Sequence, residues 1–166
     1  MNGRTILIQK TKKESVLKES ETDFRIVVLD VSLPDIEAKG LQSNDYSDES
    51  GDDTFIPERL NEKGYDFHIT VGYKGKVENW ENDMDSFLDY ITGYDGTGVE
   101  MLVYMCHHRI GRKCRMVKVT RPIPFINGGV AVVEFEIHFH VDSPRSRVEL
   151  VKDLENNVIA LREKAR

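Results

Sequence analysis

Two stretches of strict alternation between apolar and polar residues constrain this fold most. Residues 130–141 and 65–73 both alternate in this way. Successive side chains of a β-strand point to opposite faces, so a period of two predicts strands with one face on a core and the other in water. Sheets with one wet face are typically antiparallel. The apolar positions of the two stretches are Val133, Phe135, Ile137, Phe139 and Val141, and Tyr65, Phe67, Ile69, Val71 and Tyr73.

The period changes to that of a helix between residues 80 and 92. Trp80, Met84, Phe87, Leu88 and Ile91 follow one another at spacings that form a single apolar stripe on an α-helix. Asn79 is suited to cap its start, and Gly93 to end it. The sequence therefore predicts a mainly β fold with one α-helix: an antiparallel β-sandwich or rolled β-barrel flanked by a helix at about 80–92.

Shorter β-rich stretches, at 5–10, 24–31, 99–107 and 114–120, supply the remaining strands. Pro122 and Pro124 are expected to break the chain after the last of these. The C-terminal extension, 145–166, fits either a helix or a hairpin that turns at Asn156-Asn157, and the hairpin is favoured because the preceding chain is sheet.

The length of 166 residues predicts a single domain, 1–166, that folds without disulfides or metal. No apolar run is long enough to span a membrane, and the N-terminal stretch lacks the apolar region of a signal peptide. We therefore expect folding in a cytoplasm, which agrees with the presence of only two cysteines.

Charge is distributed unevenly along the chain. The net charge of −6 argues against nucleic-acid binding. A long acidic loop at 42–59 carries six acids and one Arg, whereas 101–133 carries six Lys or Arg and no acid. Both segments can be solvated loops, or the acidic loop of one subunit can meet the basic segment of the next. The candidate interface residues are Asp45, Asp48, Glu49, Asp52, Asp53, Arg109, Arg112, Lys113 and Arg115.

Residues with the potential for chemistry do not form a standard motif. The spacing of the weak zinc candidates matches no zinc pattern, and the acidic loop fails the EF-hand pattern. No nucleophile elbow or phosphate-binding loop is present. We therefore predict no enzyme, no catalytic residue, no cofactor and no metal. The weak zinc candidates are Cys106, His108, Cys114, His138 and His140.

The stretch 24–145 combines several local patterns in a fixed order. It resembles bacteriophage tail structural proteins of prophage-rich genomes, in the group of tail-tube and distal-tail proteins. The patterns are Thr54-Phe55-Ile56-Pro57, the strand 65–73 with its Lys74-Gly75 turn, Phe87-Leu88-Asp89-Tyr90-Ile91-Thr92-Gly93, Asp95-Gly96-Thr97-Gly98, Ile110-Gly111-Arg112, and 133–137 running into Val141-Asp142-Ser143-Pro144.

The resemblance implies a virion tail protein made in the host bacterial cytoplasm, with no membrane partner. Six copies would form a homo-hexameric ring or tube that contacts other phage tail proteins. Its lumen would let DNA or the tape-measure protein pass without specific binding. The chain is too short for the second domain of a distal-tail protein, which favours the tail-tube role. The alternatives are a tube component of a contractile injection system and a monomeric ligand-binding β-domain.

Overall fold

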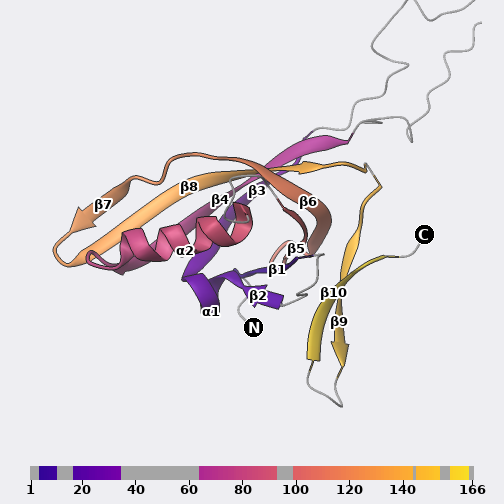
Figure 1. Ribbon diagram of the computed structural model, residues 1–166, viewed down its shortest axis with the longest axis horizontal. Helices are drawn as coiled ribbons and strands as arrows, with labels where there is room; N and C mark the ends of the chain where they lie inside the picture. Colours follow the sequence, from indigo (N-terminus) through magenta and orange to yellow (C-terminus); the bar gives the residue numbers. More distant parts are fainter. Residues whose placement is uncertain are drawn as a thin grey trace, which may run out of the picture.

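One antiparallel sheet of eight strands dominates the computed structural model, which describes residues 4–10, 17–34, 64–92, 99–143, 145–153 and 158–164 (Figure 1). The strand order is β2-β1-β5-β6-β8-β4-β3, and β7 pairs with β8 beside this path. The strands are β1 (Ile6–Lys10), β2 (Leu17–Glu19), β3 (Ile26–Ser32), β4 (Tyr65–Lys76), β5 (Glu100–Met105), β6 (Ile110–Val119), β7 (Pro124–Asn127) and β8 (Val130–Val141).

The two alternating stretches form neighbouring interior strands of this sheet, β4 and β8. They pair from Tyr65↔Val141 to Lys76↔Val130 without a register shift. Their apolar positions share one face, here called the inner face, where Ile69, Val71 and Ile137 are fully buried. The opposite, outer face carries their polar residues. The predicted one-sided antiparallel sheet is confirmed.

The predicted helix is also confirmed, as α2 (Trp80–Thr92). It lies along the inner face beside β4 and β8 (Figure 1). Met84, Phe87 and Ile91 are buried against the sheet, and the ring of Phe87 meets that of Phe135 edge-on at a centroid distance of 6.5 Å. The apolar stripe of the helix and the apolar faces of the two strands therefore pack into one core.

A second, short helix that the sequence did not predict, α1 (Ser20–Phe24), turns the chain into β3. It ends at Arg25, which adopts the left-handed conformation at φ 60°. The buried Ser20 hydroxyl donates to the Ile26 carbonyl at 2.8 Å and accepts from the Ile6 amide at 2.8 Å. One side chain therefore ties α1 to both β1 and β3.

The sheet curls but does not close. The Val28 amide donates to the Arg4 carbonyl at 2.8 Å, which brings β3 near the start of β1. No ladder joins β3 to β1 or β2 in the described chain, so the rolled barrel that the sequence offered as one alternative is open.

The C-terminal extension forms the favoured hairpin and not a helix. β9 (Val148–Asp153) pairs with β10 (Val158–Glu163) in an antiparallel ladder. Val148 and Leu161 pack on Leu7 and Leu102, which point out of the main sheet on the side away from the principal core. The second layer of the predicted sandwich is therefore only this hairpin, over β1 and β5.

Candidate assembly surface

An extended hairpin, residues 123–132 and here called the arm, forms one end of the molecule (Figure 1). β6 and β7 pair with different stretches of β8, at 137–140 and 130–133. The arm turns at Gly128-Gly129, where Gly128 adopts φ 64°, a conformation that glycine reaches at little cost. A Cβ at either glycine would meet no atom within 4 Å, so the turn lies in open space. The prolines were expected to break the chain here, but Pro124 instead opens β7.

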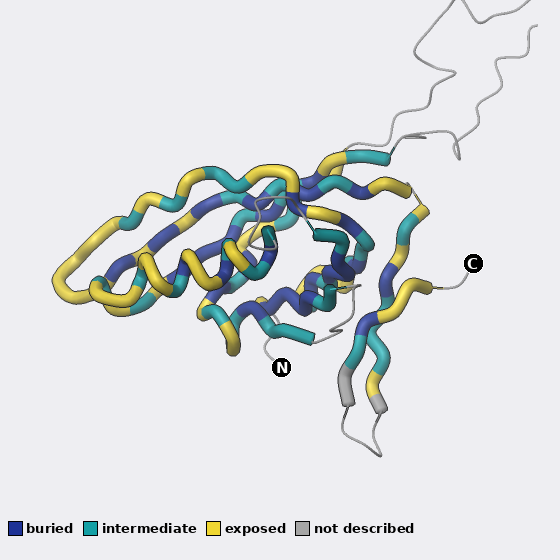
Figure 2. The backbone as a smooth tube through the Cα atoms, viewed as in Figure 1, coloured by how far each residue is buried: buried dark blue, intermediate teal, exposed yellow. Residues whose placement is uncertain are grey.

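The arm is unusual because its large apolar side chains are exposed. Ile123 is 74% and Phe125 is 72% exposed. Ile126, Val130 and Val132 of the arm are also exposed. Figure 2 shows this end of the molecule as a nearly continuous exposed strip. Isolated exposed apolar residues are ordinary, but a contiguous group marks an interaction site.

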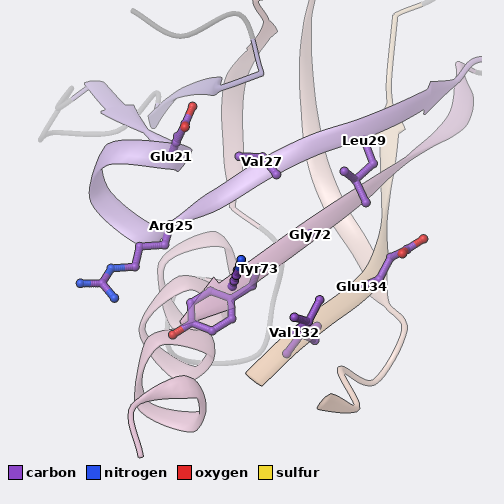
Figure 3. Close-up of a pocket in the computed structure, with 10 residues that line it drawn as sticks. Glu21, Arg25, Val27, Leu29, Gly72, Tyr73, Val132 and Glu134 are labelled. Atoms are coloured by element: carbon purple, nitrogen blue, oxygen red, sulfur yellow. The ribbon is translucent and has the colours of Figure 1, made fainter. Parts of the chain in front are cut away.

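A surface hollow continues the apolar strip from the arm across the outer face (Figure 3). Val132 belongs to both the arm and the lining of the hollow. Phe125 lies opposite Val132 on β7, so both side chains are on the outer face. Leu29, itself 46% exposed, lies over Gly72, where an added Cβ would come within 3.2 Å of Leu29 Cδ1. Charged side chains surround this apolar floor. They are Glu21, Arg25, Lys74 and Glu134.

The backbone of the arm also offers an unpaired edge. Within the described chain, β7 pairs with β8 on one side and with no strand on the other. Such an edge presents unpaired amide and carbonyl groups to a partner strand. The arm thus combines exposed apolar side chains with an available strand edge.

Three of the four predicted basic interface residues make contacts within the chain. Arg112 donates to the Tyr65 hydroxyl at 2.7 Å. Lys113 lies 3.4 Å from Glu100 and 3.5 Å from Glu163. Burial lowers the pKa of Lys113, but the attraction of these two carboxylates outweighs it and leaves the pKa raised.

Arg115 is the third, and it pairs with Asp142 at 3.1 Å. Arg109 is exposed in the β5–β6 turn at φ 55°. These basic side chains therefore already tie β6 to β4, β5, β10 and Asp142, the residue that follows β8. The predicted acidic counterparts, Asp45, Asp48, Glu49, Asp52 and Asp53, lie outside the described residues.

The weak zinc candidates are dispersed over the fold. Cys114 is buried in the principal core, where burial raises the pKa of its thiol strongly. Cys106 packs on the smaller apolar cluster under the β9–β10 hairpin, and His108 is exposed in the β5–β6 turn. His138 and His140 lie on the outer face of β8. Among the described residues, no group of three or more His, Cys, Asp or Glu is arranged to hold a metal ion.

The pairing of β4 with β8 creates a histidine cluster that the sequence alone did not reveal. His68 lies opposite His138, and their rings stack at a centroid distance of 4.9 Å. His138 Nε2 lies 3.2 Å from a Glu136 oxygen. Both nitrogens of His140 face carboxylates, Asp66 at 2.6 Å and Asp142 at 3.2 Å. The available signal was a histidine on the polar face of each alternating stretch.

Comparison of the chain with protein-family models, curated proteins and solved structures finds no match. In the part of the chain that the structure describes, neither helix is long and apolar enough to cross a membrane.

Proposed function

We propose that this chain is a structural subunit of a bacteriophage or prophage tail that assembles with copies of itself into a ring or tube. The observation that supports self-assembly is the arm, with its exposed apolar side chains and open strand edge. The sequence resemblance supplies the tail assignment. The proposal places the protein in the virion tail, with DNA or the tape-measure protein passing through the lumen.

The exposed apolar side chains of the arm make it suited to pack on a neighbouring copy of the chain. A hairpin that leaves Phe125 and Ile123 in water carries a solvation cost that a partner surface removes. Contact between different patches on identical subunits is head-to-tail, and it closes into a ring when the rotation between subunits permits. An arm at one end of the molecule fits this type of contact.

The competing function is a monomeric ligand-binding β-domain. The hollow beside Leu29 is the feature that favours it, since its floor is apolar and its rim charged. Small-molecule sites enclose most of the ligand surface. This hollow lies open on the outer face and merges with the arm through Val132, which suits a protein contact better. A tube component of a contractile injection system shares the same assembly logic.

The test is electron microscopy of the purified chain at high concentration, with multi-angle light scattering on the same samples. Rings or stacked tubes with six-fold symmetry are the expected result. A strict monomer at every concentration would contradict self-assembly and favour the ligand-binding domain. To separate tail from injection system, antibodies against the chain are applied to induced phage particles, where labelling along the tail is expected.

A further inference from the structure

We propose that His68 and His138 form a binding site for a first-row divalent transition metal ion, with Zn²⁺ and Ni²⁺ as the expected ligands. The two residues lie directly opposite each other on β4 and β8, in the longest ladder of the sheet. Their side chains leave the outer face side by side, with rings stacked at 4.9 Å. This inference is independent of the proposed tail function.

The backbone fixes the spacing that a chelate needs. Side chains opposite each other in an antiparallel pair have Cβ atoms about 4.5–5.5 Å apart. Two imidazole nitrogens that each lie about 2.0–2.1 Å from one zinc ion are roughly 3.3 Å apart in a tetrahedral site. Stacked rings reach this separation by rotation about their side-chain bonds. The strands need not move, because β4 and β8 pair without a register shift here.

The hydrogen bonding of His138 prepares one nitrogen for a metal. When Nε2 donates to Glu136, at 3.2 Å, the lone pair resides on Nδ1. A carboxylate behind a ligating imidazole is the usual arrangement in metal sites, where it fixes the tautomer and the ring orientation. Glu136 occupies that position.

His140 is two residues from His138 on the same strand and face, but its environment differs. Both of its ring nitrogens already face carboxylate oxygens, those of Asp66 and Asp142. A metal would have to displace one of these contacts. The site therefore has two protein ligands, which agrees with the lack of any described group of three or more metal-ligating residues. Water completes the coordination.

The chemistry of the ligands determines the class of metal. Imidazole suits Zn²⁺, Ni²⁺ and Cu²⁺, whereas Ca²⁺ and Mg²⁺ prefer oxygen ligands. Both histidines are partly exposed, so an ion can enter from solvent. Bound metal would connect β4 to β8 and stabilise their pairing.

The test is isothermal titration calorimetry of the full chain with ZnCl₂ and with NiCl₂. His107 and His108 are adjacent in the β5–β6 turn, with ring centroids 5.2 Å apart, and can compete for metal. The background protein therefore carries His107→Asn and His108→Asn. It is expected to bind one equivalent of metal. His68→Asn and His138→Asn each remove a ligand, so each should weaken binding by more than the roughly tenfold that loss of an outer-shell partner costs.

His140→Asn is the matched control and should retain the affinity of the background protein. The proposal is overturned if the background protein shows no saturable binding, if His68→Asn leaves the affinity unchanged, or if His140→Asn weakens binding as much as the other two. Nuclear magnetic resonance of the unsubstituted chain gives a second measurement that needs no variant. Ni²⁺ should broaden the imidazole signals of His68 and His138 before that of His140, and uniform broadening would contradict the site.

Discussion

Replacement of Phe125 by Ser tests whether the arm is the assembly contact. The Phe125 side chain is 72% exposed in the single chain. A phenylalanine buries about 150–250 Å² when fully enclosed, so roughly 110–180 Å² of this side chain is available to a partner. At about 25 cal/mol per Å² this area corresponds to about 3–4.5 kcal/mol.

The measured effect on assembly is expected to be smaller than this area predicts, because association also costs entropy and desolvation. Central aromatic residues of interfaces typically contribute about 2–4 kcal/mol on truncation. That range raises the dissociation constant of each subunit contact by roughly 30- to 1000-fold. The free energy of unfolding of the single chain should change by no more than about 0.5 kcal/mol, because the side chain makes little contact with its own core.

Sedimentation velocity over a range of concentrations measures the association, and thermal unfolding measures the stability of the same samples. Leu33→Ser provides the matched control, since Leu33 is an exposed apolar residue, at 37%, outside the arm and the hollow. We expect assembly to be lost in Phe125→Ser and kept in Leu33→Ser. If Phe125→Ser associates as strongly as the unsubstituted chain, the arm is not the contact and the reasoning fails.

Three further predictions concern the fold. Ser20→Ala removes the hydroxyl that joins β1 to β3, so two buried backbone groups lose their hydrogen-bond partner. The free energy of unfolding measured by urea titration should fall by about 1–3 kcal/mol. An unchanged value would contradict this role of Ser20. Gly111→Ala should weaken the packing of the β9–β10 hairpin on the main sheet, because the new Cβ would lie 2.2 Å from the Val148 carbonyl oxygen. Limited proteolysis should then cleave the C-terminal hairpin faster than in the unsubstituted chain. Burial, followed by the hydrogen bond to Asp83, raises the pKa of Tyr73 to about 12. Because the fold favours the protonated form, the free energy of unfolding should fall as the pH rises from about 10 to 12. Melting curves recorded across this pH range should show a smaller fall for Tyr73→Phe than for the unsubstituted chain.

Local patterns predicted the centre of the fold because their side chains all bury on one side. β4, β8 and α2 were each expected from a period of two or 3.6 that the core then satisfied. The C-terminal hairpin was expected because Asn156-Asn157, between two apolar stretches, is typical of a turn. The short helix α1 was missed, because its five residues include no apolar repeat and it is tied down by Ser20 contacts with distant strands.

The candidate sites depended more on tertiary contacts. The basic residues at 109–115 were expected at a subunit interface, yet Arg112, Lys113 and Arg115 contact polar side chains of their own chain. Charge patterns in a sequence do not show which opposite charges lie nearby after folding. β7 was missed because two prolines suggested a break, although an edge strand accommodates proline without losing a ladder bond.

The sequence by itself determined which residues face the core, because hydrophobic burial acts on each strand or helix through its own period. It also determined the antiparallel, one-sided character of the central sheet. Only the tertiary structure decided which strands are neighbours, since pairing joins residues far apart in the chain. That choice placed His68 against His138, left the arm without a partner along one edge, and brought Arg4 to Val28 without closing the sheet.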